Sequence, residues 1–366
     1  MSTRSARLVT ASFLCVSLLY VSLVAVGCIG AVTRLADDQK YVVRVDDSTG
    51  WRIHELKTGV GTDRTLTVTV APQAGGNAYS LTVNGEELLR QPPRISDLPG
   101  FVYGNPILYP TPNRVRDGKF AFGERQFQFS RNHNGNHLHG LVNTLPWVVG
   151  ALEVEDEVIK LPLTLDISEG HPVYEDFPFD HKVEVTYSLS SEGLRIDAKV
   201  KNRDTRRLPF GFAIHPYFRI LGERAETFIA VPARRHMEAS QFSLLPTGEL
   251  HQLDGSAKDL RSPVSLDKLD LDDVYWGMDP DRPAVYEARD RGVRVTLEAS
   301  EIFSHMVVYT PRDQDYFCLE NQTCSTDAHN LYSRGQSEAA HLLILEPVGS
   351  PGATAEGSVL FRIEFD

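Results

Sequence analysis

Cysteine is scarce in this chain of 366 residues, which contains four. That number is too small for a scaffold held by disulfide bridges or for a cysteine-rich zinc module. Basic charge is also in deficit, because 37 lysine and arginine residues face 49 acidic residues and leave a net charge of −12. Nucleic-acid-binding proteins need a basic surface, so the composition argues against nucleic acid as a partner.

Long hydrophobic runs are missing everywhere except at the N-terminus, which excludes a protein that crosses a membrane many times. The chain also lacks a phosphate-binding Walker loop, a Gly-x-Ser-x-Gly elbow and a His-Glu-x-x-His zinc helix. No stretch predicts a long amphipathic helix, and residues 265–271 are the best short candidate. The remaining composition, 42% hydrophobic and 23% charged, is ordinary for a soluble globular protein, and the length suits one large domain.

The N-terminus has the features of an export signal. Arg4 and Arg7 precede a run of 26 uncharged residues, 8–33, which as a helix is long enough to cross a hydrocarbon core of about 30 Å. Residues 25–28, Ala-Val-Gly-Cys, resemble a bacterial lipobox in which Cys28 is lipidated after cleavage. Three outcomes follow: a lipoprotein, an uncleaved anchor, or ordinary cleavage of a signal peptide. Each of them places the rest of the chain outside the cytoplasm, in the periplasm or an equivalent space.

We therefore divide the chain at residue 33. Residues 1–33 are the export signal or membrane anchor, and residues 34–366 form a single domain whose first part, about 34–45, is expected to be a tether. Contact with a membrane is expected through the N-terminal segment only.

The body of the chain shows the period-two alternation of β-strands. Apolar residues alternate over residues 183–189 and again over 194–200, on either side of a Ser-Ser-Glu-Gly turn, which predicts an antiparallel hairpin. Asn84-Gly85 is a strong hairpin-turn dipeptide. Many short strands joined by Gly, Pro and Asn turns predict an all-β fold, a large antiparallel sandwich. Further strands are predicted at residues 65–70, 79–83, 293–297 and 359–365.

Two polar motifs stand out in the first half of the body. Asn113-Arg114 follows a proline-rich segment, where a guanidinium can present a fork of donors, although a surface arginine fits equally well. His137 and His139 are two residues apart and share a face if they lie on a strand, which is a possible metal-binding spacing. Residues 142–144 supply no carboxylate as a third ligand, so we expect no metal here and a structural role for His137.

Two further motifs stand out in the second half. His215 ends an apolar and aromatic run, where a lone histidine is more often a satisfied core residue. Glu320 ends an apolar strand, and a buried carboxylate is costly unless it is paired or functional. Cys318 lies two residues before Glu320 and is predicted on the same face of that strand. The sequence does not decide whether Cys318 and Cys324 form a disulfide bridge. It also allows Asp272-Asp273 to be a simple turn.

Taken in chain order, these motifs resemble the aldose 1-epimerase (galactose mutarotase-like) family. The resemblance covers roughly residues 60–366 and implies a large antiparallel β-supersandwich, in agreement with the strand pattern. The motifs that carry it are Asn-Arg at 113–114, Asn-His-Leu-His-Gly at 136–140, Pro-Phe-Gly-Phe-x-x-His-Pro-Tyr-Phe at 209–218, Leu-Asp-Asp-Val-Tyr at 271–275 and Phe-Cys-Leu-Glu-Asn-Gln at 317–322.

The resemblance also implies roles for particular residues. His215 matches the general acid of the family and Glu320 its general base. Asp272 is implied to contact the sugar, with the adjacent Asp273 as the alternative. Asn321 and Leu141 stand where the family often has Thr and Gly, and these departures bear on substrate preference. The implied sugar contacts are Asn113, Arg114, His139 and Asp272.

The implied activity interconverts the α and β anomers of a free hexose. This monosaccharide substrate is the expected partner of the protein. Opening the cyclic hemiacetal requires removal of a proton from the C1 hydroxyl and delivery of one to the ring oxygen. A carboxylate and an imidazole can do both without a cofactor or a metal. We expect the carboxylate to favour the charged form of His215.

Two other functions remain open. Another carbohydrate-active enzyme, a glycosidase or a lyase, could use Glu320 and Asp272 as its two carboxylates. A non-catalytic sugar-binding module would keep Arg114 and Asp272 but would not need both His215 and Glu320. A sugar-phosphate substrate fits an exported protein less well, because phosphorylated hexoses are mainly cytoplasmic.

The N-terminal interpretation is tested by mass spectrometry of the mature protein. We expect membrane retention and a mature chain that begins at lipid-modified Cys28, because small residues precede that cysteine. Cys28→Ser should abolish the lipid and serves as the control. An intact Met1 or Ser2 in the membrane fraction would indicate an uncleaved anchor. A full-length protein in the cytoplasm would contradict export altogether.

Overall fold

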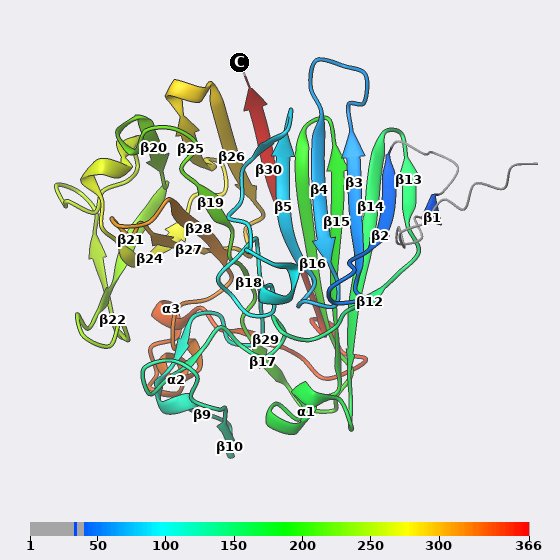
Figure 1. Cartoon of the computed structure of the whole chain (residues 1–366). Helices are drawn as coiled ribbons and strands as arrows, with labels where there is room; N and C mark the ends of the chain where they lie inside the picture. Colours follow the sequence, from blue (N-terminus) through cyan, green and yellow to red (C-terminus); the bar gives the residue numbers. More distant parts are fainter. Residues whose placement is uncertain (1–32, 35–39, 366) are drawn as a thin grey trace, which may run out of the picture.

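Antiparallel strands dominate the computed structural model, which describes residues 33–34 and 40–365 (Figure 1). Nearly all of the segment interpreted as an export signal lies outside these residues. Within the described part, no helix has the length and apolar character needed to cross a membrane.

The N-terminal strands form a six-stranded antiparallel sheet in chain order. Residues 66–71 and 77–83 confirm two of the predicted strands, and Asn84 and Gly85 form the turn after the second. Both turn residues have positive φ, 50° and 84°, as a two-residue hairpin of this kind requires. The strands are β1 (Thr33–Arg34), β2 (Tyr41–Val45), β3 (Arg52–Thr58), β4 (Leu66–Ala71), β5 (Asn77–Val83) and β6 (Glu86–Glu87).

The expected tether over residues 34–45 is wrong for its second half. Strand β2 pairs with β3 from Tyr41 to Val45, and the side chains of Tyr41 and Val43 are buried. Tyr41 also shares a 2.6 Å hydrogen bond between its hydroxyl and Nδ1 of His54. The alternation of apolar residues from position 41 is a strand pattern, so the folded body begins earlier than the sequence suggested.

A ten-stranded sheet contains the predicted hairpin, which is confirmed as β15 and β16 with paired residues from His181–Asn202 to Ser190–Gly193. The predicted strands at residues 293–297 and 359–365 are β26 and β30, and they pair with each other. The strands of this sheet are β12 (Val148–Val149), β13 (Glu153–Glu155), β14 (Val158–Ile167), β15 (His181–Ser190), β16 (Gly193–Asn202), β20 (Thr227–Ala230), β23 (Val264–Ser265), β25 (Ala284–Ala288), β26 (Val293–Ala299) and β30 (Thr354–Phe365).

An eight-stranded sheet completes the main framework, and its strand β28 is buried along its whole length. Its strands are β7 (Ile107–Leu108), β18 (Ala213–Ile214), β19 (Tyr217–Arg219), β21 (Ala233–Ala239), β22 (Pro246–Gln252), β24 (Asp272–Met278), β27 (His305–Tyr309) and β28 (Tyr316–Gln322). Three two-stranded ribbons are β8 (Arg114–Val115) with β11 (His137–Leu138), β9 (Lys119–Phe122) with β10 (Arg125–Gln128), and β17 (Leu208–Phe210) with β29 (Leu343–Leu345).

The core lies between the sheets, which is where the apolar faces of the strands meet. In Figure 1 the blue strands β3 and β4 run alongside the green strands β14 and β15, and both sets contribute to one apolar cluster. The hydroxyl of Tyr187, on β15, donates a 2.7 Å hydrogen bond to the carbonyl of Gly76 at the end of the six-stranded sheet. This buried bond joins the two sheets directly.

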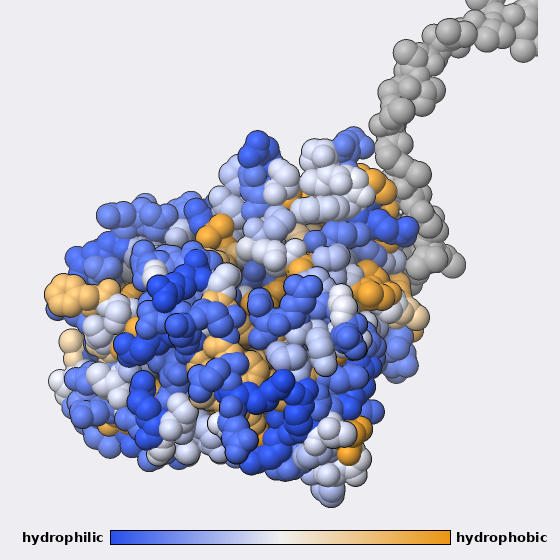
Figure 2. Space-filling model, turned by 90° about the horizontal axis from the view of Figure 1, so that it is seen from below, coloured by the Kyte–Doolittle hydropathy of each residue, from blue (hydrophilic) through white to orange (hydrophobic). Residues whose placement is uncertain are grey.

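Helices are few and short, as the sequence predicts: α1 (Pro172–Asp176), α2 (Ala328–Ser333) and α3 (Ser337–Ala340) in the described residues. The candidate at residues 265–271 is only a 3₁₀ turn, Leu266–Lys268, with Ser265 as its N-terminal cap. The predicted fold class, a large antiparallel β-supersandwich, is therefore confirmed. The face seen from below is mostly hydrophilic, with small separated hydrophobic patches (Figure 2).

Candidate active site

Strand register brings His215 and Glu320 together. Strands β18 and β19 both pair with β28, Ala213 with Gln322 and Tyr217 with Cys318. The same register, continued across the break between β18 and β19, sets His215 opposite Glu320. Pro216 lies in this break and has no amide hydrogen to contribute to a ladder.

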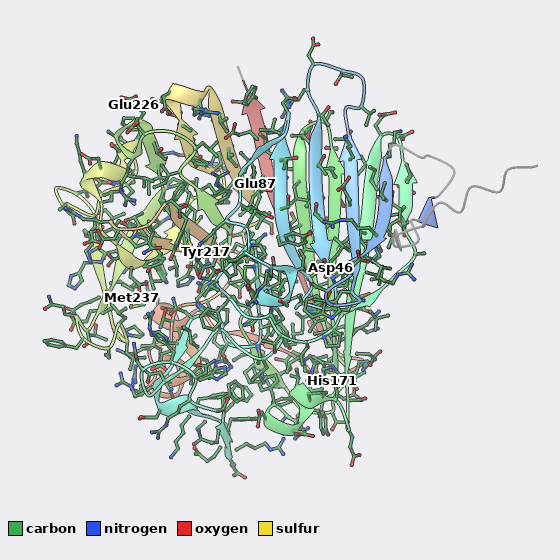
Figure 3. The ribbon with its side chains drawn as sticks, viewed as in Figure 1. Asp46, Glu87, His171, Tyr217, Glu226 and Met237 are labelled. Atoms are coloured by element: carbon green, nitrogen blue, oxygen red, sulfur yellow. The ribbon has the colours of Figure 1, made fainter. Side chains whose placement is uncertain are left out.

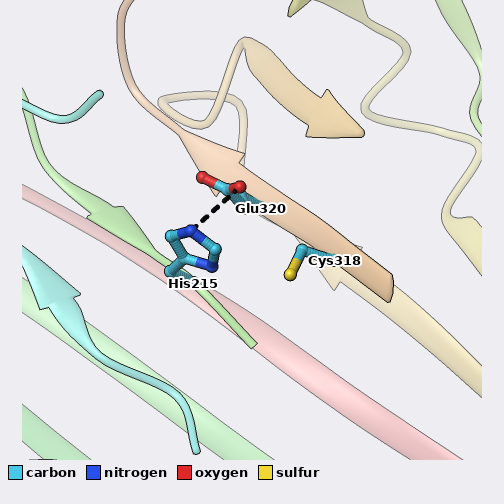
Figure 4. A group of neighbouring side chains, drawn as sticks. All are labelled: His215, Cys318 and Glu320. Carbon is cyan, nitrogen blue, oxygen red and sulfur yellow. Dashed lines mark ion pairs between the residues drawn. The ribbon is translucent and has the colours of Figure 1, made fainter. Parts of the chain in front are cut away.

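The two side chains make a buried contact (Figure 4). Nε2 of His215 lies 3.2 Å from Oε1 of Glu320, and the side chains are 4% and 2% exposed. The amide of Gln322 donates to the other carboxyl oxygen, Oε2, at 2.9 Å. The backbone amide of His215 donates to the carbonyl of Pro106 at 3.0 Å, which holds the histidine in place. Nδ1 of His215 is buried and has no hydrogen-bond partner among the described residues.

Burial decides the protonation of this pair. It lowers the pKa of His215 to about 3. It raises the pKa of Glu320 well above its usual value, and the negative charge of Asp272 adds to that rise. The expectation that the carboxylate keeps His215 charged is therefore wrong, because desolvation has the largest effect on the pKa of the histidine. Burial therefore favours the neutral form of both side chains.

Arg114 and Asp272 form a second polar contact, from the ribbon β8–β11 and from the start of β24. The guanidinium donates to Oδ2 of Asp272 at 3.2 Å and to Oδ1 of Asn113 at 2.9 Å. Both ends remain partly open, with the side chains of Arg114 and Asp272 13% and 27% exposed. A polar ligand can therefore reach both side chains. Arg114 is not the fully exposed surface arginine that the sequence left open as an alternative.

The structure separates the two adjacent aspartates. Asp272 pairs with Tyr309 of β27, which in turn pairs with Cys318 of β28, so its side chain shares the face that carries Glu320. Asp273 points to the opposite face and forms an ion pair with Lys258. Asp272 is thus the member of the pair that lies on the side of His215 and Glu320.

His139 lies against His215, with ring centroids 5.0 Å apart in an edge-to-face arrangement. Its backbone has a positive φ of 67°, and its amide donates to the carbonyl of Asn113 at 2.9 Å. Gly140 follows at φ 71°, where an added Cβ would lie 2.3 Å from the carbonyl oxygen of Tyr109. Burial is the main cause that lowers the pKa of His139 well below its usual value, and the neighbouring His215 is the second cause. The ring is therefore neutral.

His137 has the structural role expected of it. Its ring nitrogens lie 2.8 Å from the carbonyl oxygen of Ser130 and 3.0 Å from that of Gly140. Both nitrogens are therefore engaged with the backbone, while His139 turns the other way toward His215. The two rings therefore contact different partners, despite the spacing of the residues in the sequence.

Two residues next to the pair had no role in the sequence interpretation. Tyr217, near the centre of the molecule in Figure 3, stacks on His215 with ring centroids 4.5 Å apart. Its hydroxyl lies 3.4 Å from Nε2 of His215. Gln322 is the donor to Glu320 described above. Each lies two residues after its partner in the chain, so the period-two rule for strands was the signal that could have identified them.

Both cysteines of the described body are buried free thiols. Cys318 lies beside His215 and Glu320, on the predicted face of β28, and Cys324 lies in a separate apolar cluster near Leu331. The bridge left open by the sequence is absent from the described residues.

The chain as a whole is similar to proteins of one family. Residues 60–341 match the family model described as aldose 1-epimerase. A galactose mutarotase of Sus scrofa is 28% identical over 161 residues, which cover 43% of this chain and 44% of the relative. The corresponding protein of Homo sapiens is 25% identical over 182 residues, 47% of this chain and 51% of the relative. The chain thus spans about half the length of the curated relatives it matches.

Solved structures agree on the fold. A galactose mutarotase-like protein from Clostridium acetobutylicum superimposes with a TM-score of 0.80 at 22% identity, covering 90% of this chain and all of the other. A galactose 1-epimerase from Lactobacillus acidophilus gives a TM-score of 0.69 at 19% identity, covering 87% and 96%.

Proposed function

Because the chain belongs to the aldose 1-epimerase family, we propose that it is a mutarotase, an isomerase that interconverts the α and β anomers of a free hexose. The observation that carries the proposal is the buried contact between His215 and Glu320. Burying an acid and a base together is costly, and a protein that only bound sugar would gain nothing from this contact. The partly open Arg114 and Asp272 supply donors and acceptors for sugar hydroxyls.

The proton inventory of the pair matches the reaction. Ring opening removes one proton from the C1 hydroxyl and delivers one to the ring oxygen, and closure reverses both steps. A pair that holds one proton has one member able to accept and one able to donate at the same time. Across a 3.2 Å contact the proton can pass between Glu320 and His215, which produces the acid–base assignment that the family implies. The sugar changes its anomeric form, and the pair ends with the protons it began with.

The other carbohydrate-active functions have less support. A glycosidase needs two carboxylates set across a glycosidic bond. Here the carboxyl of Glu320 contacts an imidazole, and Asp272 is held by the guanidinium of Arg114. Polarimetry on freshly dissolved α-D-glucose and α-D-galactose tests mutarotation directly, and reducing-end release from oligosaccharides tests cleavage.

We also propose that the enzyme acts outside the cytoplasm, held at a membrane through its N-terminal segment.

The first prediction concerns the acid–base pair. His215→Ala and Glu320→Gln should each lower kcat for mutarotation by about 10²–10⁴-fold, because each removes one positioned proton carrier. Glu320→Gln is the cleaner change, since the side chain keeps its shape. The exposed residues His251 and Glu301 provide matched controls, His251→Ala and Glu301→Gln, which should keep wild-type rates. Near-wild-type rates in either folded site variant would refute the assignment.

The pH profile is a second prediction. The singly protonated pair exists from about pH 3, where His215 begins to gain a proton, up to the raised pKa at which Glu320 loses its own. We therefore expect kcat/KM to show no loss towards acid near the ordinary histidine pKa, and to fall towards alkali only above the usual range of a carboxyl group, after subtraction of the uncatalysed rate. A loss of kcat/KM towards low pH that is centred near 6.5, the ordinary value for histidine, would show that burial does not keep His215 neutral.

Sugar binding supplies a third prediction. Arg114→Ala should raise KM by about 10–100-fold, because a hydrogen bond from a charged donor contributes about 1.5–3 kcal/mol. The effect on kcat should be smaller, since Arg114 does not contact Glu320. Arg125→Ala, an exposed position on β10, is the control for loss of one positive charge. Unchanged kinetics over a full substrate titration would leave Arg114 with a structural role only.

A further inference from the structure

A third ligand-type side chain completes a cluster around the acid–base pair. Cys318 lies two residues before Glu320 on β28, on the same face, and is 0% exposed (Figure 4). Ligand atoms of His215, Cys318 and Glu320 all lie within 4.8 Å of one another. The proposed mutarotation uses the imidazole and the carboxyl group but has no step for a thiol.

The distances are close to those of a metal site. Zinc binds nitrogen and oxygen ligands at about 2.0–2.2 Å and sulfur at about 2.3 Å, so tetrahedral ligands stand about 3.3–3.5 Å apart. Nε2 of His215 and Oε1 of Glu320 are already 3.2 Å apart. The thiol therefore has to approach the other two atoms by no more than about 1.5 Å to complete the site.

The donor types select the ion. One nitrogen, one sulfur and one oxygen suit zinc and cadmium, whereas magnesium and calcium prefer oxygen alone. A divalent ion with one thiolate and one carboxylate is neutral overall, which matters in a buried site. The neutral imidazole of His215 is ready to bind, and the protons of Cys318 and Glu320 leave to solvent as the metal enters.

We propose that His215, Cys318 and Glu320 form a binding site for a zinc-like divalent cation, which inhibits the enzyme by occupying its acid–base pair. Three protein ligands leave a fourth position for water or a sugar hydroxyl. Sugar and metal then compete for the same two side chains. The ion is an inhibitor, since the proposed reaction requires none.

Cadmium is the direct probe, because its bond to a thiolate produces an ultraviolet charge-transfer band. Titration of the wild-type chain with CdCl₂ should produce this band at one equivalent. Cys318→Ala should abolish the band, and His215→Ala should weaken binding. Cys324→Ala is the matched control, since its thiol is buried in another cluster, and it should keep the band. No band in the wild type, or a band that survives in Cys318→Ala, overturns the site.

Inhibition is measured separately with ZnCl₂ against mutarotation, each variant being compared with its own rate without metal. Cys318→Ala should raise the half-inhibitory zinc concentration by at least about 10-fold, because loss of an outer-shell partner alone costs 10–100-fold. EDTA should restore the wild-type rate. This arm rests on the proposed function, whereas the cadmium band does not. A band without any mutarotation leaves the metal site standing and refutes the proposed function, and mutarotation without a band does the reverse.

Discussion

The site depends on one constraint, the burial of an imidazole and a carboxyl group on the same strand ladder. All seven residues of β28 are buried, so Glu320 has no water with which to share its charge. His215, opposite it, is equally dry. Desolvation favours the neutral form of each group over the charges that such a pair would carry on a surface. The surrounding sheets exclude water from both side chains.

Charge at the site is therefore graded from the interior to the opening. Burial favours neutral forms of the innermost pair, the neutral ring of His139 lies beside it, and the ion pair of Arg114 and Asp272 is partly exposed. Asp272 acts on both regions, because its charge raises the pKa of Glu320 while its own charge is matched by Arg114. Loss of the arginine would raise the pKa of Glu320 further, because its positive charge lowers that pKa and balances Asp272.

Local pattern was enough to predict the strands and the fold class, because side chains alternate with period two whatever their partners are. It also placed Cys318 and Glu320 on one face. Pattern did not show that His215 lies opposite Glu320, since register is set by pairing between segments about a hundred residues apart. It also missed β2, whose strand pattern follows directly after the N-terminal segment, and it misjudged the charge of His215, which depends on burial by the whole fold.

The break between β18 and β19 limits where residues can be inserted into the chain or deleted from it. Two short strands hold the same register on β28, with only His215 and Pro216 between them. One residue added or removed there would slip one strand and turn the imidazole to the far face of the sheet. Insertions are free to accumulate in the exposed loops, whereas the interval between β18 and β19 must remain two residues long. Any chain that keeps the contact between His215 and Glu320 must keep the spacing as well as the residues.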